Sequence, residues 1–361
     1  MKYSIIEKID AGERTAWSKA RADASAIAAD EGYVPIEVCG TGTERENTSV
    51  AAKLRAHACM GKIWKKAFAG LGKGDELFIQ LPVVNNYLLM QKLFKKLRRR
   101  GVKIVALVHD LETLRMIKDE NLSKKQKLRM RIEEIGTLKQ CSRLIVHNAE
   151  MQKLVASIGI KTPMTVLGVF DYLISPEENG PSVTALADAR MEKKTRSVVI
   201  AGNLDEHKSG YIYTIPEDVT VDLYGVHYKE NNKKNLHYHG AFPADKLPFV
   251  LDGGFGLIWD GPSADTCTGA YGDYLRFNNP HKTSLYIASC FPVIIWEKAA
   301  LAAFVTENGI GFTVSSLSEI PEKLRTLTGA QYAEMYENVK KLSEKLRGGG
   351  FLRVALNAQT K

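Results

Sequence analysis

The stretch NNPHKTSLYIASCFPVIIW, residues 278–296, places amides, a proline and a lysine before a predicted helix and a buried strand. We expect Asn279 to cap this helix and Pro280 to occupy its first position. The free N–H groups of the first turn attract anions, and Lys282 would add a positive charge beside Thr283. The pattern predicts a phosphate or diphosphate site. A plain capped helix with a surface lysine is the alternative.

Further polar and aromatic residues follow predicted strands in both halves of the chain. Asn203 and Lys208 come after SVVIAG, Tyr224 follows VTVDL, and His109 and Asp110 follow KIVALV. Ligands of open parallel sheets bind beyond the carboxyl ends of the strands. Lys208 could contact a second phosphate, and the ring of Tyr224 could line a base or sugar pocket. A polar loop and a tyrosine at the edge of the core are the plainer interpretations.

Short β-branched runs alternate with helical patterns along all 361 residues, and these elements must position the residues above. This order predicts parallel sheets covered by helices on both faces, in two α/β domains. The expected strands are 3–8, 34–40, 76–82, 103–110, 143–148, 164–170, 197–202, 219–225, 236–242, 254–259, 291–296 and 309–314. The expected helices are 17–31, 47–69, 85–100, 123–139, 149–157, 243–252, 280–289, 297–307, 318–326 and 330–347.

The net charge of +9 is concentrated in two amphipathic segments, 91–101 and 123–131. Such basic helix faces are attracted to anionic lipid headgroups or to a phosphorylated carrier, and an ordinary solvated face is the alternative. The sequence has no interleaved aromatic platform, zinc finger or RNA-binding signature, so we do not expect a nucleic-acid partner.

Other features point to a cytoplasmic protein. No run of 18 apolar residues occurs, and the N-terminus has no apolar signal-peptide core. The five cysteines are scattered without a CxxC pair, so we expect them to be reduced core residues.

Several common enzyme signatures are absent from the sequence. It contains no GxxxxGK[ST] loop, no GxGxxG after a strand and no GxSxG, which argues against P-loop, nicotinamide and hydrolase chemistry. It also contains no DxD triplet that would clamp a metal-bound sugar diphosphate.

The segment GNLDEHKS, the YG after the next strand and the block GAYGDYLRFNNPHKTSLYIASCFPVIIW resemble GT-B glycosyltransferases. The resemblance is to bacterial β-1,6-galactofuranosyltransferases and to the streptococcal glucosyltransferases that extend adhesin glycans. It is dense from 198 to 314. The N-terminal half matches in layout and in HD at 109–110, and Phe291 replaces a leucine-like residue.

This resemblance implies two Rossmann-like domains that face a cleft, with a C-terminal helix crossing back to the N-terminal domain. The expected boundaries are an acceptor domain at 1–175, a linker at 176–197, a donor domain at 198–345 and a returning tail at 346–361. By resemblance, the nucleotide-sugar contacts are Asn203, Lys208, Tyr224, Asn279, Lys282 and Thr283. No cofactor and no metal are implied.

An inverting transfer needs a base that takes the proton of the acceptor hydroxyl. We favour Asp110 over His109 for this role; the alternative is that Asp110 caps the next segment and His109 is a packing residue. Arg115 could bind a carrier phosphate or pair with Asp110. Thr15 and Ser18 could contact acceptor or sugar, or cap the helix that begins there.

The resemblance therefore implies a hexosyltransferase that moves galactofuranose or glucose from a UDP-sugar to a glycan acceptor, which could be lipid-linked, in polysaccharide or glycoprotein synthesis. The expected setting is the cytoplasm, at the inner face of the membrane, as a homo-oligomer. The alternative is a non-catalytic subunit that binds sugar nucleotides within a glycosyltransferase complex.

Overall fold

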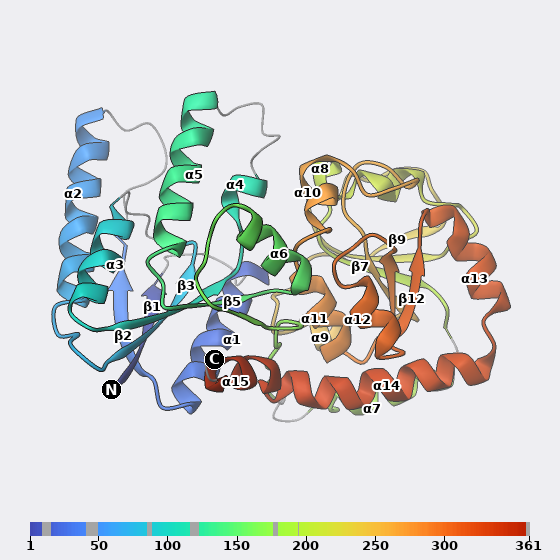
Figure 1. Cartoon of the computed structure of the whole chain (residues 1–361). Helices are drawn as coiled ribbons and strands as arrows, with labels where there is room; N and C mark the ends of the chain where they lie inside the picture. Colours follow the sequence, from blue (N-terminus) through green and yellow to red (C-terminus); the bar gives the residue numbers. More distant parts are fainter. Residues whose placement is uncertain are drawn as a thin grey trace.

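The protein is described by a computed structural model that covers residues 1–8, 16–40, 50–84, 89–115, 123–175, 180–193 and 195–358. It contains two six-stranded parallel sheets, one in each half of the chain. All twelve predicted strands are confirmed, with ends displaced by a few residues. Figure 1 shows the two sheets side by side, each covered by helices on both faces.

The first sheet has the order β2-β1-β3-β4-β5-β6. Its strands are β1 (Lys2–Lys8), β2 (Val34–Cys39), β3 (Glu76–Leu81), β4 (Lys103–Val108), β5 (Arg143–Val146) and β6 (Met164–Val166). The helices around it are α1 (Ala16–Asp30), α2 (Val50–Ala67), α3 (Met90–Arg99), α4 (Glu112–Arg115), α5 (Lys124–Leu138) and α6 (Ala149–Ser157).

The second sheet has the order β12-β11-β10-β7-β8-β9. Its strands are β7 (Val198–Asn203), β8 (Val221–Val226), β9 (Leu236–Tyr238), β10 (Phe255–Ile258), β11 (Val293–Trp296) and β12 (Gly311–Val314). The short helices α8 (Glu206–Ser209), η1 (Gly210–Thr214), α9 (Leu247–Val250), α10 (Gly269–Tyr274), α12 (Ala302–Glu307) and η2 (Leu317–Glu319) connect them. The remaining helices are α7 (Val183–Lys193), α11 (His281–Ala288), α13 (Ile320–Thr326), α14 (Gly329–Arg347) and α15 (Gly350–Asn357).

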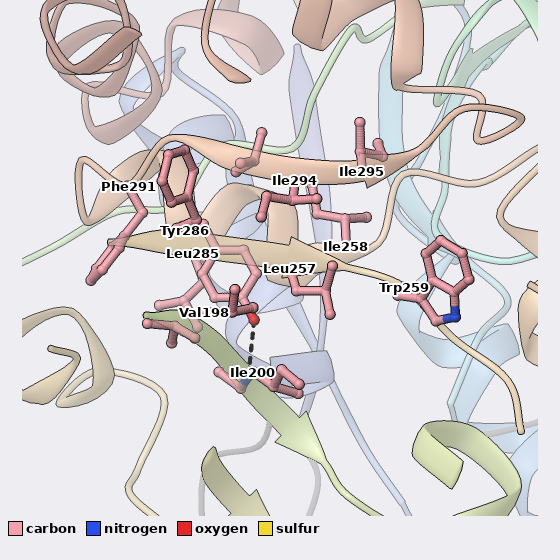
Figure 2. Close-up of a cluster of buried hydrophobic side chains, with 14 of the residues drawn as sticks. Val198, Ile200, Leu257, Ile258, Trp259, Leu285, Tyr286, Phe291, Ile294 and Ile295 are labelled. Atoms are coloured by element: carbon pink, nitrogen blue, oxygen red, sulfur yellow. Dashed lines mark hydrogen bonds between the residues drawn. The ribbon is translucent and has the colours of Figure 1, made fainter. Parts of the chain in front are cut away.

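The core of the second domain forms where α11 lies against β7 and β10 (Figure 2). The ring of Tyr286 packs against the backbone of β10, and a Cβ at Gly256 would lie 2.2 Å from its Cγ atom. The Tyr286 hydroxyl accepts a hydrogen bond from Ala201 N–H at 2.9 Å. Glycine at 256 therefore lets α11 approach the sheet closely, which fixes the position of its N-terminus beside the strand ends.

The C-terminal helix crosses back to the first domain, as predicted (Figure 1). Arg143, at the start of β5, donates to the carbonyls of Ala355 and Leu356 at 2.5 and 2.8 Å. At the other end of α15, the carboxylate of Asp171 accepts from the backbone N–H groups of Phe351 and Leu352. Both ends of α15 are thus anchored on first-domain residues.

Two local predictions need correction. Pro280, not Asn279, is the N-cap of α11, and it makes no side-chain cap hydrogen bond. Cys39 and Cys59 are exposed instead of belonging to the core, although all five cysteines are free thiols. The predicted linker, 176–197, contains the short helix α7, whose Arg190 is buried and donates to Leu251 O at 3.4 Å.

None of the helices in the described part of the chain combines the length and the apolar character that a membrane crossing requires.

Candidate active site

His109 directly follows β4, and its side chain is buried. Its Nε2 atom lies 2.7 Å from Gln80 Oε1, and because Gln80 donates its own amide elsewhere, the imidazole is the donor here. The ring stacks on Phe170, with centroids 5.4 Å apart. Burial, and then the positive charge of Arg21, lowers the pKa of His109 well below its ordinary value. His109 is therefore neutral at pH 7, with Nε2 held by a hydrogen bond.

Asp110 lines a cavity of about 140 Å³ at the carboxyl ends of β3 and β4. The walls are mainly apolar, and the polar exceptions include four carboxylates: Asp110, Glu112, Glu133 and Glu134. The buried guanidinium of Arg21 interacts electrostatically with Asp110 and Glu112. The Asp110 carboxylate is only partly exposed and lies beside space large enough for a small ring-sized group.

Asn279 joins the two domains through every polar atom of its side chain. Its amide Nδ2 donates to the carbonyls of His147 and Gly168, both at 2.9 Å, and its Oδ1 accepts from Asn148 Nδ2 at 2.7 Å. Its backbone N–H donates to His147 Nδ1 at 2.9 Å. The side chain is 3% exposed, so the structure gives Asn279 an interdomain position.

His147 is held as a neutral ring between the domains. Nδ1 accepts from Asn279, so the proton is on Nε2, which donates to the Val108 carbonyl at 2.8 Å. Burial lowers the pKa of His147 to about 4. The same junction holds His281, whose ring lies against Tyr172. Its two nitrogens make no well-aligned hydrogen bond with a described residue, although the backbone of Asp171 lies close enough to favour the protonated ring. Burial, followed by the charge of Lys19, lowers the pKa of His281 to about 3.

Lys282 lies in the first turn of α11 and points to the end of β10. Its ammonium group donates to Asp260 Oδ1 at 2.8 Å and to the Trp259 carbonyl at 3.0 Å. The two side chains are only 10% and 6% exposed. Burial opposes the charge of Lys282, but the field of Asp260, the field of Tyr286 and the hydrogen bond to Asp260 act together against it, and the pKa of Lys282 is raised. Lys282 is therefore one member of a buried ion pair, not the surface lysine of the alternative interpretation.

The other predicted donor residues differ in accessibility. Asn203, at the end of β7, is exposed, and its Oδ1 atom accepts from Asp205 N–H at 3.0 Å. Lys208, on α8, is partly exposed and lies 5.3 Å from the centroid of the Tyr271 ring. These two residues lie near the surface at the strand ends, where a diphosphate could reach them.

Tyr224 and Thr283 are buried. The Tyr224 ring stacks on His239, and its hydroxyl accepts from Asp252 N–H at 3.1 Å. The hydroxyl of Thr283 is fully buried and has no partner among the described residues. Neither side chain faces open space in this structure.

The predicted acceptor contacts are the least defined. Ser18 lies in the first turn of α1 and is partly buried. Arg115 ends α4, where the backbone alone is described, and Thr15 lies outside the described residues. Their contact roles stay predictions.

Sequence reasoning missed several residues of this junction. His147 and Asn148 follow β5, so the rule that drew attention to His109 and Asp110 could have identified them too. Tyr274 and Glu134 could not be found this way. Tyr274 accepts from the backbone of Leu111 across the domain boundary, and Glu134 lies in the middle of a helix.

The arrangement places an acid–base candidate and a cation on opposite sides of one junction. Asp110 follows a first-domain strand, whereas Lys282, Lys208 and the α11 N-terminus follow second-domain strands. A group transfer in which a hydroxyl attacks directly can use both, a base for the nucleophile and positive charge for the leaving group.

Comparisons with known proteins identify the family of the chain. The family model described as glucosyltransferase 3-like, N-terminal domain, matches residues 2–169, and the one described as C-terminal domain matches 198–359. The chain is 36% identical over 357 residues to the beta-1,6-galactofuranosyltransferase WbbI of Escherichia coli K12, covering 98% of this chain and 96% of that protein. It is 26% identical to glucosyltransferase 3 of Streptococcus gordonii, covering 80% of each.

Solved structures show the same fold at low identity. Sucrose-phosphate synthase from Thermosynechococcus elongatus has a TM-score of 0.64 at 10% identity, covering 99% of this chain and 97% of that one. Anabaena Alr3699/HepE, in complex with UDP and glucose, has a TM-score of 0.56 at 12% identity, covering 99% and 98%. The fold is GT-B, and the chain belongs to the glucosyltransferase 3-like family of glycosyltransferases.

Proposed function

We propose that this glycosyltransferase moves a hexose, galactofuranose or glucose, from a UDP-sugar to a glycan acceptor, with inversion and without a metal ion. The observation that carries the proposal is the 36% identity to a beta-1,6-galactofuranosyltransferase over nearly the whole of both chains. Glucose stays in the proposal because the streptococcal relatives are glucosyltransferases. The UDP carrier is supported by the structural neighbour that holds UDP and glucose.

In the proposed reaction, the second domain holds the donor. The diphosphate would meet the positive end of α11, with Lys208 and Asn203 at the neighbouring strand end. Lys282 would contribute through its ion pair, because a nearby diphosphate and Asp260 would share its ammonium group. Positive charge placed there stabilises the diphosphate as it leaves.

Asp110 is the proposed base. Its carboxylate lies beside the cavity that would receive part of the acceptor, and it would take the proton of the attacking hydroxyl. His109 is a weaker candidate for this role, because its Nε2 is engaged with Gln80 and the ring is packed on Phe170. We therefore assign His109 a supporting position behind Asp110.

Contact with an anionic membrane is part of the proposal. α3 with Arg100 and α5 together carry eleven Lys and Arg against two Glu, a net charge as large as the +9 of the whole chain. α5 also exposes Leu128 and Ile132, each 58% exposed and one turn apart. A basic face with apolar side chains is typical of helices that lie in the membrane interface, and it suits a lipid-linked acceptor.

The test is release of free nucleotide by the purified chain across a panel of UDP-, GDP- and dTDP-sugars, with and without EDTA. We expect turnover with UDP-galactofuranose or UDP-glucose that survives EDTA, and an inverted anomeric signal of the product by NMR. Saturable binding of UDP-sugars without any turnover would favour the non-catalytic subunit. Loss of turnover in EDTA with rescue by manganese would refute the metal-free mechanism.

A further inference from the structure

Glu134 makes two hydrogen bonds that no role assigned so far explains. Its Oε1 atom accepts from the backbone N–H of Glu112 at 2.7 Å, and its Oε2 atom accepts from Thr113 N–H at 3.2 Å. These N–H groups begin α4, where the helix has no acceptors of its own for them. A carboxylate on α5 thus caps a four-residue helix that begins two residues after Asp110.

The loop on which Asp110 lies is fixed by hydrogen bonds on both sides of that residue. Before it, His109 N–H donates to the Leu81 carbonyl at 2.7 Å. After it, Leu111 N–H donates to the hydroxyl of Tyr274, from the second domain, at 2.9 Å. Glu134 then holds the next two backbone N–H groups. Four of the five consecutive N–H groups from 109 to 113 therefore have fixed acceptors in three different elements.

Burial disfavours the charged carboxyl of Glu134, so its position calls for a functional explanation. Burial raises the pKa of its carboxyl to about 7, and the hydrogen bonds to α4 only partly oppose this. The negative charges of Glu112 and Asp110 raise the pKa of Glu134 further. Glu133, also on α5, lines the same cavity. Arg21 on α1 interacts electrostatically with Asp110 and Glu112. Met90 is the one described residue of α3 that lines the cavity. The surroundings of Glu134 therefore disfavour the charged form of its carboxyl, and yet two backbone N–H groups donate to it.

We propose that Glu134 is a positioning residue for glycosyl transfer, whose carboxylate anchors the first turn of α4 and so holds the Asp110 carboxylate against the acceptor. This inference rests on the proposed function of Asp110. The geometry explains why a carboxylate is needed. Two oxygens are required to accept two N–H groups, and the ionised form presents both as acceptors, whereas the protonated form uses one oxygen as a donor.

The mechanism predicts how activity responds to Glu134→Gln. The amide keeps the size of the side chain but offers one acceptor oxygen, so one N–H of α4 loses its partner. A displacement of the base by about 1 Å can cost on the order of 10²-fold in rate, so we expect kcat to fall by about 10- to 100-fold with KM for the donor unchanged. Glu150→Gln is the control, since Glu150 is a first-domain carboxylate that lies outside the cavity and accepts a hydrogen bond from Lys153 instead of from α4.

The pH profile separates positioning from simple structural damage. In the natural protein, protonation of Glu134 near neutral pH should weaken its grip on α4, so that activity declines as the pH falls through about 7. The Glu134→Gln variant cannot titrate there and should lack this decline. Amide hydrogen exchange of residues 111–115, measured at pH 6 and pH 8, should show the same difference without reference to activity.

The experiment is steady-state release of UDP from the best donor of the panel, from pH 5.5 to 9, for the natural protein, Glu134→Gln and Glu150→Gln, alongside the exchange measurement. The proposal is supported if Glu134→Gln, unlike Glu150→Gln, loses kcat, the activity decline near pH 7 and the exchange protection of α4. It is overturned if Glu134→Gln keeps the natural kcat and pH profile, or if Glu150→Gln shows the same losses. Absence of turnover in the natural protein would refute the proposed function instead, and the exchange data would still decide whether Glu134 anchors α4.

Discussion

The two domains present different electrostatic environments to their junction. At the end of β10, Lys282 and Asp260 neutralise each other within a buried pair, and further positive charge comes from Lys208 and the N-terminus of α11. At the end of β4, four carboxylates gather around one cavity, and the buried cation Arg21 lies behind them. A leaving diphosphate needs compensating positive charge, whereas a base needs a carboxylate that gains by taking a proton. The contrast therefore matches a division of labour, with donor binding on the second domain and proton transfer on the first.

The largest expected effect comes from removing the base of the first domain. Asp110→Asn keeps the size of the side chain but cannot accept a proton, so turnover should fall on the order of 10²- to 10⁴-fold. Initial rates at saturating donor would measure this. The control is His109→Gln, which keeps a polar group near Gln80 and should cost much less. Turnover near the natural level in Asp110→Asn would move the base elsewhere.

The next effect tests the buried pair of the second domain. From the sequence alone, Lys282→Ala would be expected to leave the fold as stable as before. The ion pair reverses that expectation, because the variant leaves the Asp260 carboxylate buried without its cation. We expect a loss of about 3–5 kcal/mol in the free energy of unfolding, measured with urea. Combining Lys282→Met with Asp260→Asn should restore most of it. An unchanged urea midpoint in Lys282→Ala would show that the pair contributes nothing.

Two histidines of the junction offer a matched pair for a third prediction. His147→Phe leaves Asn279 N–H and the Val108 carbonyl without partners, and should cost about 1–3 kcal/mol for each orphaned group. His281→Phe removes nitrogens that make no well-aligned hydrogen bond, only a weak contact with the Asp171 backbone, so stability at pH 7.5 should be unchanged or slightly higher. Chemical denaturation of both variants would measure the difference. Similar losses in both would mean that His281 has a polar partner in solution.

The same pair predicts a pH dependence of stability. With a folded pKa of about 3 against about 6.5 in the unfolded chain, His281 binds its proton only after unfolding across this range. Stability contributed by the neutral ring is therefore present above pH 6.5 and is lost as the pH falls toward 3. His281→Phe should flatten this acid slope. An identical slope in the variant and the natural protein would exclude His281 as its source.

The smallest effect concerns the basic surface. Leu128→Ser and Ile132→Ser should each weaken binding to vesicles with anionic lipid by a few-fold, since each buries little area in the interface. Val354→Ser, at a residue that is 67% exposed on α15, is the control. Co-flotation with anionic and with neutral vesicles would measure binding. Equal behaviour on both kinds of vesicle would leave α3 and α5 as ordinary solvated helix faces.

The strands and their order along the chain could be predicted from the sequence, because β-branched runs and helical periods are local signals. The ends of strands then drew attention to His109 and Asp110, which follow β4, and to Asn203, which is the last residue of β7. The roles of buried polar residues could not be predicted in this way. Asn279 looked like a helix cap, but its partners are His147, Asn148 and Gly168, more than 100 residues away. Such partners are set by how the domains meet, which no local pattern encodes.

The ion pair of Lys282 also could not be predicted from local sequence patterns. A lysine in the first turn of a helix is unfavourable to the dipole, which suggested a bound anion as compensation. The structure supplies a compensating anion from the protein itself, Asp260, at the end of a strand 22 residues earlier. The sequence contained both residues, but their pairing depends on how α11 packs against β10.

The division of labour between the domains is tested most directly by measuring UDP affinity calorimetrically, together with turnover, in Asp110→Asn and Lys208→Ala. The account predicts that Asp110→Asn binds UDP with the natural Kd and loses turnover, whereas Lys208→Ala weakens UDP binding by about 10-fold or more, the scale of a hydrogen bond to a charged group. If Asp110→Asn weakens UDP binding as much as Lys208→Ala does, or if Lys208→Ala leaves the Kd unchanged, the assignment of donor and base to opposite domains is contradicted.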